Sequence, residues 1–168
     1  SWPEDTTFTL DLSTTSSDID SADINWSVTG NTFITITINQ TTGIVTLVPA
    51  GNFTGTELVT FNATDGMLST LVTATLNVTP VNDAPEFNAS IPLMNITMLE
   101  DVANTSIVLA PSFFDIDGPD MNWTSVVSGL ALNVSIDQLT GGVSIVPPAN
   151  LSGNATIVFT ATDGSLSS

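Results

Sequence analysis

Apolar and polar residues alternate with a period of two along much of the chain, which is the pattern of a β-strand that buries one face. The alternating apolar positions are Ile34-Ile36-Ile38, Phe61-Ala63, Val72-Ala74-Leu76-Val78, Leu130-Leu132-Val134-Ile136 and Ile157-Phe159-Ala161. No window carries an apolar stripe at helical spacing with caps, and Gly, Pro, Asn and Asp recur between the runs. The pattern therefore predicts an all-β chain of short strands joined by turns.

The strand pattern occurs twice, because residues 4 to 66 and residues 100 to 164 repeat the same short words. The offset is 96 at the start of the repeat (100 minus 4) and 98 at its end (163 minus 65). The matched words are Glu4-Asp5 and Glu100-Asp101, Asp18-Ile19-Asp20 and Asp115-Ile116-Asp117, Asn25-Trp26 and Asn122-Trp123, Thr42-Gly43 and Thr140-Gly141, Pro49 and Pro147, Asn52 and Asn150, Gly55 and Gly153, and Ala63-Thr64-Asp65-Gly66 and Ala161-Thr162-Asp163-Gly164. A repeat of about one hundred residues is long enough to bury its own core, so each copy is expected to be a domain.

The repeat length also predicts the architecture. Several short strands in about one hundred residues fit a seven-stranded antiparallel β-sandwich of the immunoglobulin or cadherin type. We expect one such domain at residues 1–80, a linker at residues 81–86 and a second domain at residues 87–168. Trp26 and Trp123, at matched positions, are interpreted as packing residues.

The charge of the chain is entirely negative. Its 168 residues include 17 Asp and Glu but no Lys, Arg, His, Cys or Tyr, giving a net charge of -17. A chain without a cation cannot neutralise phosphates, so binding to nucleic acid or to an anionic membrane surface is excluded. With 42% hydrophobic residues the chain is expected to fold, and its natural counterion is a metal cation.

Acceptor sites for N-glycosylation are unusually dense. Twelve of the fourteen Asn residues begin an Asn-x-Ser/Thr word, whereas random placement among the 45 Ser and Thr residues would give about four. These residues are Asn25, Asn39, Asn52, Asn62, Asn77, Asn88, Asn95, Asn104, Asn122, Asn133, Asn150 and Asn154. The alternative is that a Ser/Thr-rich β-protein accumulates such words passively. We expect N-linked glycans on an extracellular or cell-surface protein, with Asn62, Asn77 and Asn133 on the solvent face of their strands.

The order of the words resembles the cadherin family. The end of a cadherin domain and its joint are similar to three consecutive segments of this chain, Val59 to Gly66, Leu71 to Val78 and Val81-Asn82-Asp83-Ala84-Pro85. In detail the chain resembles microbial cadherin-like tandem repeats, which share the Asn-Asp-Ala-Pro joint, the Glu-Asp start, the Pro-x-x-Asn-x-x-Gly run and the Thr-Asp-Gly strand end.

The resemblance implies Ca²⁺ at the joint between the domains. The ligands would be Glu4, Asn82, Asp83, Asp115, Asp117 and Asp163. Oxygen ligands with several carboxylates suit Ca²⁺, and a cation would relieve the repulsion among them. Asp18, Asp20 and Asp65 would form a matching half-site towards a preceding domain, and Glu100 would contribute to a following joint.

Two observations limit this implication. The family's Leu-Asp-Arg-Glu ligand segment is replaced here by Pro49 to Glu57 and by Pro147 to Ala155, so fewer or weaker ions are expected. In addition, the Asp residues of the Asp-Ile-Asp words could serve only to make turns, which is a common use of Asp.

The two terminal domains are expected to be incomplete at the chain ends. The first repeat has no counterpart of a strand expected at Phe87 to Met98, and the second has none of the strand Leu71 to Thr79. Either the chain is a segment of a longer repetitive polypeptide, or a neighbouring subunit donates the strand. Both alternatives give a head-to-tail array of copies or further repeats.

The composition argues against an enzyme, because without His, Cys and Lys only carboxylates remain for catalysis. No catalytic residue is assigned. We expect a structural module of an N-glycosylated extracellular filament, stalk or surface layer, stiffened by Ca²⁺, with no membrane insertion in this segment. The combination of microbial-looking repeats with many glycosylation words points to an archaeal surface fibre. The alternative function is an adhesive or carbohydrate-binding module of a secreted or cell-surface protein.

Overall fold

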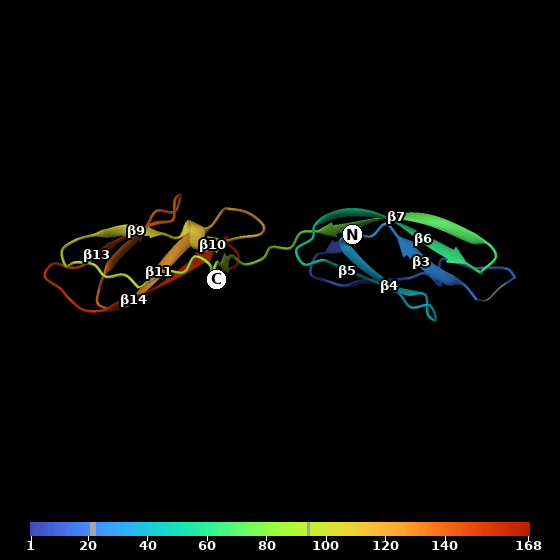
Figure 1. Cartoon of the computed structure of the whole chain (residues 1–168), viewed down its shortest axis with the longest axis horizontal. Coiled ribbons are helices and arrows are strands. Elements are labelled where there is room, and N and C mark those ends of the chain that lie inside the picture. Colours follow the sequence, from blue (N-terminus) through green and yellow to red (C-terminus); the bar gives the residue numbers. More distant parts are fainter. Residues whose placement is uncertain (21–22, 94) are drawn as a thin grey trace. The chain divides into compact units, whose positions relative to one another are not determined.

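The computed structural model describes residues 1–20, 23–93 and 95–168. The chain divides into two compact units, Ser1–Val81 and Asn82–Ser168 (Figure 1). Over the described residues the regular elements are β-strands, apart from a short 3-10 helix, η1 (Ala110–Ser112). The all-β prediction is therefore confirmed.

The first unit is a sandwich of two sheets. The four-stranded sheet has the order β1 (Trp2–Pro3), β7 (Ser69–Thr79), β6 (Gly55–Thr64) and β3 (Asn25–Thr29). The three-stranded sheet has the order β2 (Phe8–Asp11), β5 (Ile44–Pro49) and β4 (Ile34–Ile38). Strand β7 runs antiparallel to β6 along the whole of β6, and β1 joins the other edge of β7 in a parallel direction.

The core of the first unit lies between these sheets. Val45 and Leu47 of β5 and Val59 of β6 are fully buried, and Leu76 and Val78 of β7 close the same core. These residues are two apart on their strands, so the period-two pattern places them on one face. Burial of a side chain of this size contributes about 1.5 to 3 kcal/mol.

The second unit repeats much of this arrangement. Strand β11 (Asn122–Gly129) pairs with β14 (Ala155–Thr162), and a three-stranded sheet has the order β12 (Asn133–Ile136), β13 (Gly142–Val146) and β9 (Asn104–Val108). Two short strands, β8 (Glu86–Phe87) and β10 (Phe113–Phe114), form a separate pair. The core contains Leu109, Phe113, Trp123, Val143, Ile145 and Ala161.

Three details differ from the sequence expectations. Within the described residues, the strand expected from Phe87 to Met98 is present only as β8, because a turn begins at Asn88, whose carbonyl accepts the Ile91 N–H at 3.0 Å. The strand expected from Leu130 starts at Asn133, since the left-handed Gly129 (φ 89°) ends β11 just before it. Trp123 is a core residue, whereas Trp26 is half-buried.

Matched turns in the two units have the same backbone. Gly43 and Gly141 have φ values of 72° and 69°, and a Cβ at either position would lie 2.8 or 2.7 Å from a backbone nitrogen. Only glycine fits such an approach with a positive φ. The repeated Thr-Gly word therefore closes the same turn twice.

A glutamine caps the edge strand of each unit at its tryptophan. Gln40 accepts the Trp26 N–H at 2.9 Å and donates to the Trp26 carbonyl at 2.7 Å. Gln138 does the same for Trp123, at 2.8 and 2.9 Å. Because edge strands otherwise present unpaired backbone groups, each glutamine protects the outer edge of β3 or β11.

Candidate metal centre

The Asp-Ile-Asp words fold into the same turn in both units. The Oδ1 atom of Asp115 accepts the Asp117 N–H at 2.8 Å, and the Oδ1 atom of Asp18 accepts the Asp20 N–H at 2.8 Å. One oxygen of each first Asp is therefore used to hold the turn.

The Thr-Asp-Gly words also fold alike. In the second unit Asp163 Oδ1 accepts the N–H groups of Ser165 and Leu166, at 2.6 and 2.7 Å. In the first unit Asp65 Oδ1 accepts those of Met67 and Leu68. The Leu166 N–H, the Asn82 amide and the Ser165 N–H hold the pKa of Asp163 below its ordinary value. The N–H groups of Leu68 and Met67 lower the pKa of Asp65 in the same way.

The second carboxylate oxygens in the second unit face the linker residues. The Asn82 side-chain amide donates to Asp163 Oδ2 at 2.5 Å. The Asp83 N–H donates to Asp117 Oδ2 at 2.6 Å. Asn82, Asp83, Asp117 and Asp163, which were assigned to one metal site from the sequence, are thus connected by hydrogen bonds.

Asp115 adds an oxygen without a partner. Its Oδ2 atom is buried and accepts no hydrogen bond, although the residue as a whole is only half-buried. A buried carboxylate oxygen is costly unless a donor or a cation satisfies it. The side chains of Asn82, Asp83, Asp115, Asp117 and Asp163 offer carboxylate and amide oxygens, which are the ligands that a hard cation such as Ca²⁺ prefers.

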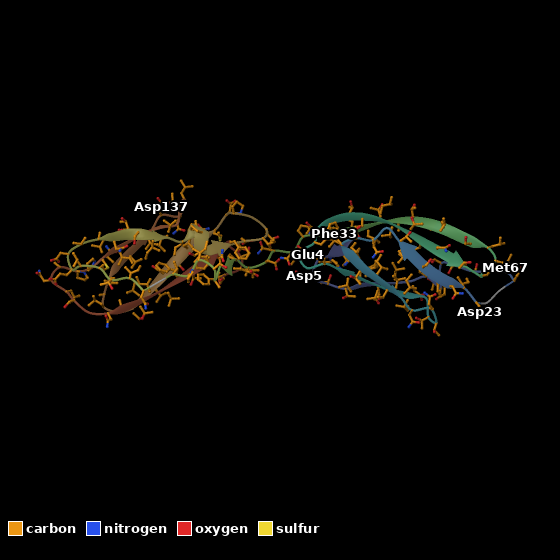
Figure 2. All side chains as sticks on the ribbon, in the orientation of Figure 1. Glu4, Asp5, Asp23, Phe33, Met67 and Asp137 are labelled. Atoms are coloured by element: carbon orange, nitrogen blue, oxygen red, sulfur yellow. The ribbon has the colours of Figure 1, made fainter. Side chains whose placement is uncertain are left out.

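Glu4 has a similar unsatisfied oxygen in the first unit, where Figure 2 places it at the end opposite Met67. The residue is 2% exposed, its Oε1 accepts the Val81 N–H at 2.9 Å, and its Oε2 is buried without a partner. Glu100, at the matched position of the second unit, is exposed. The two Glu residues therefore have different surroundings.

Two expectations receive no direct geometric support, namely the clustering of the predicted Ca²⁺ ligands and the half-site in the first unit. In the part of the chain that the structure describes, no three carboxylates form a group that could hold a metal ion. For the half-site, Asp18 and Asp20 precede β3, and Asp65 lies between β6 and β7. Figure 2 places the labelled residues Asp23 and Met67, which also precede β3 and lie between β6 and β7, at the same end of the first unit. The half-site stays a prediction.

Glu57 has a role that the sequence did not reveal. It is 8% exposed, and its carboxylate accepts the N–H groups of Thr32, Phe33 and Ile34. The matched position in the second unit is Ala155, which cannot accept such bonds. Glu57 therefore holds the start of β4. The one sequence signal for this role was that the second repeat has no acidic residue at the matched position.

The glycosylation words lie mostly on the surface. Nine of the twelve Asn side chains are exposed, and Asn62, Asn88 and Asn104 are half-buried. Asn77 and Asn133 point to solvent as expected. Asn62 is also out of phase with the core residues Val59 and Phe61 of β6, but it is half-buried and its Oδ1 atom is buried.

The first unit matches a known family. Residues 1–79 match the sequence profile of the bacterial Ig domain. No curated protein matches the chain. Bacterial Ig domains are typically extracellular and non-enzymatic. Among the described residues, no helix is long and apolar enough to span a bilayer.

Several solved structures are similar to the chain. The first two domains (EC1-2) of human protocadherin-24 are 19% identical with a TM-score of 0.55, over 88% of this chain and 73% of that one. The protocadherin GammaB4 extracellular domain is 14% identical with a TM-score of 0.47, over 87% and 27%. An endo-fucoidan hydrolase of glycoside hydrolase family 107 is 24% identical with a TM-score of 0.39, over 87% of this chain but only 22% of the hydrolase. The protocadherin-24 likeness confirms the cadherin-like β-sandwich fold.

Proposed function

Since the chain is a tandem of immunoglobulin-like and cadherin-like β-sandwich repeats, we propose that it is a structural segment of an N-glycosylated extracellular filament, stalk or surface layer. In this proposal Ca²⁺ binds Asp115, Asp117 and Asp163 together with Asn82 and Asp83, and Glu4 is the ligand contributed by the first unit. The ion stiffens the connection between successive domains of a head-to-tail array. A cell surface of archaeal type is the setting that we propose for this array.

The observation that carries the proposal is the attachment of the linker to the acidic turns. Asn82 and Asp83, which directly follow the first unit, are hydrogen-bonded to Asp163 and Asp117. These hydrogen bonds order the linker against the second unit, as a stiff joint between domains requires. The buried Oδ2 of Asp115 supplies an oxygen that a cation would satisfy.

The local turns orient the carboxylate oxygens that would bind the ion. The Oδ1 atoms of Asp115 and Asp163 already fix their turns, so their Oδ2 atoms are held in place for binding. Ca²⁺ would supply the positive charge that a chain without Lys, Arg and His lacks.

Thermal unfolding tests the calcium proposal. We expect the second unit to melt at a higher temperature in millimolar Ca²⁺ than in excess EDTA, because a ligand that binds only the folded state stabilises it by about 2.7 kcal/mol at one hundred times its Kd. The double variant Asp115→Asn, Asp117→Asn should lose this rise. The matched control, Asp18→Asn with Asp20→Asn, changes the same turn in the first unit and should keep it. An equal Ca²⁺ response in both variants would contradict the proposal.

Intact mass analysis of the native protein tests the glycan part of the proposal. Glycans on most of the nine exposed Asn acceptors are expected, with lower occupancy at Asn62 because part of its side chain is buried. A native protein without glycans would contradict this part of the proposal. The acceptor words would then be a consequence of the Ser/Thr-rich composition alone.

One observation favours the second candidate, an adhesive or carbohydrate-binding module. Phe33 and Phe53 stack with ring centroids 4.9 Å apart, and Phe33 is 54% exposed (Figure 2). Exposed aromatic rings can stack on the apolar face of a sugar. Glycan-array binding that is lost on Phe33→Ala would favour this candidate, whereas binding of no glycan would remove its support.

A further inference from the structure

An exposed pair of aromatic rings lies beside one of the glycosylation acceptors of the first unit. Phe33, labelled in Figure 2, is the most exposed aromatic side chain among the described residues. Its ring stacks on that of Phe53, and the two ring planes are inclined by only 13°. Phe53 is the middle residue of the acceptor word Asn52-Phe53-Thr54, in which Asn52 is exposed. The aromatic pair therefore begins one residue away from a point of sugar attachment.

Backbone hydrogen bonds hold Phe33 against the turn that carries Asn52. The Ala50 N–H donates to the Phe33 carbonyl at 2.7 Å, and the Phe53 N–H donates to the Ala50 carbonyl at 3.0 Å. The Phe33 N–H donates to the buried carboxylate of Glu57. Both rings thus belong to backbone that is already fixed, so a ligand that contacts them orders few further groups.

The second unit has the matched acceptor but a different residue after it. The word there is Asn150-Leu151-Ser152, and its asparagine is exposed. This asparagine has the same left-handed backbone conformation as Asn52. A leucine therefore stands where the first unit has Phe53.

The strand register shows that the exposed phenylalanine of the first unit has no aromatic counterpart either. Thr35 pairs with Val48 in the first unit. Asn133 pairs with Val146, the valine that matches Val48 at the offset of 98 (146 minus 48). Two residues before Asn133 stands Ala131, where the first unit has its exposed phenylalanine. The second unit thus keeps the acceptor and its backbone and lacks both rings.

A sugar attached to Asn52 would meet the exposed ring at a high local concentration. The apolar face of a sugar ring can stack on an aromatic ring, and this contact needs no charged group from a chain that has no cations. A short covalent link makes the contact intramolecular, at an effective concentration on the order of millimolar. A foreign glycan would have to displace the attached one, so the attached sugar is the favoured occupant.

We propose that the first sugar of an N-glycan on Asn52 stacks on Phe33, so that the glycan of the chain itself covers the Phe33–Phe53 pair. A glycan on Asn150 makes no such contact. This inference rests on the glycosylation proposed above. It assigns the aromatic pair to a sugar of the same chain and not to a sugar of another molecule.

NMR spectroscopy of the full chain tests the inference. The chain is produced in a host that attaches N-glycans, and each glycan is trimmed to a single N-acetylglucosamine. We expect the ring of Phe33 to shift the proton signals of the sugar on Asn52 upfield, with the sugar on Asn150 as an unshifted internal reference. Hydrogen exchange at the Phe53 amide should be about threefold slower than in the chain made without glycans, because the contact stabilises the turn.

Two variants separate the aromatic ring from the fold. Phe33→Leu keeps an apolar side chain and removes the ring, so the upfield shift and the slower exchange should both be lost. Phe114→Ala changes a phenylalanine of the second unit that is 46% exposed, and it should keep both effects. Circular dichroism establishes that the two variants are folded.

The outcomes distinguish this inference from the proposed glycosylation. If Asn52 carries a sugar whose signals match those of the sugar on Asn150, or whose shift persists in Phe33→Leu, the inference is wrong and the glycosylation stands. A native protein modified at Asn150 but not at Asn52 would likewise overturn it. Binding of a free glycan to Phe33 while Asn52 is occupied would show a receptor for foreign sugars instead. A native protein without any glycan would contradict both proposals.

Discussion

Phe61 in the first unit and Phe159 in the second occupy the same place in the repeat, yet Phe61 is 9% exposed and Phe159 is half-buried. Glu4 and Glu100 form a second such pair, the first being buried and the second exposed. In the first unit β1 and β7 extend the sheet beyond β6, and in the second no named strand extends it beyond β14. The period-two pattern therefore determines which side chains face inward, whereas their burial also depends on the strand that pairs beside them.

Features formed by nearby residues are preserved in both units. The Asp-Ile-Asp turn, the Thr-Asp-Gly turn and the Thr-Gly turn all recur with matching hydrogen bonds or backbone angles. Each of these features needs only a few adjacent residues. The units thus agree in local structure and differ in how far the larger sheet is completed.

The largest expected difference between the units concerns the core aromatic pair. Phe61→Ala should lower the free energy of unfolding of the first unit by about 3 to 5 kcal/mol, because it leaves a cavity in a closed core. Phe159→Ala should cost the second unit about half as much, since less apolar surface is lost. Urea unfolding followed by hydrogen exchange in each unit measures both values. Equal losses would contradict the difference in burial between the two phenylalanines.

Glu57 offers a change that affects only the first unit. Glu57→Ala should cost about 2 to 4 kcal/mol, because the N–H groups of Thr32, Phe33 and Ile34 lose their acceptor. Glu57→Gln keeps one acceptor oxygen and should cost less. Ala155→Glu in the second unit is the converse control in the same unfolding experiment. It is not expected to stabilise that unit, because the Leu130 N–H already bonds to the Asn154 carbonyl. An unaltered unfolding curve for Glu57→Ala would contradict this account.

The glutamine caps should show a smaller effect that is similar in the two units. Gln40→Ala and Gln138→Ala each remove two hydrogen bonds, at a cost of about 1 to 2 kcal/mol. Sedimentation should also show more self-association, because the edge of β3 or β11 is then unprotected. A variant that stays monomeric and equally stable would show that the caps do not protect the edge.

The smallest expected effect distinguishes the two Thr-Asp-Gly turns by acid titration. The pKa values of Asp65 and Asp163 are both lowered by backbone N–H groups, and only the pKa of Asp163 is also lowered by Asn82. A lowered pKa means that the stabilisation is complete above the ordinary value of 3.8 and is lost as the pH falls through the folded-state value. In carboxyl NMR titrations, Asn82→Ala should raise the pKa of Asp163 and leave that of Asp65 unchanged. A shift of both pKa values would point to a general change in the fold.

Much of the fold could be predicted from the sequence because its determinants are local. The apolar positions of β4, β6, β7 and β14 follow the alternation, and the duplicated words indicated two similar units. The link between Asn82, Asp83 and the acidic turns was expected only through the cadherin resemblance. Hydrogen bonds join Asn82 to Asp163 and Asp83 to Asp117, whereas the Ca²⁺ site itself stays a prediction.

Other features could not be predicted, because they depend on partners distant in sequence. Gln40 bonds to a residue 14 positions away, and nothing in its neighbourhood distinguishes it from a surface glutamine. Glu57 reaches backbone groups 23 to 25 positions away. The segment from Phe87 to Met98 looks like a strand by its apolar residues, but a strand also needs a neighbour, and beyond Phe87 none pairs with its described residues.

The matched left-handed residues have a practical consequence for mapping the sugars. Asn52 and Asn150 have φ values of 58° and 57°, and both begin glycosylation words. Asparagine tolerates this backbone conformation better than glutamine does, so the customary Asn→Gln replacement would add strain of about 1 kcal/mol that has nothing to do with a missing glycan. At these two acceptors the modification is better abolished by Thr54→Val and Ser152→Ala, which remove the required hydroxyl and leave the turn intact.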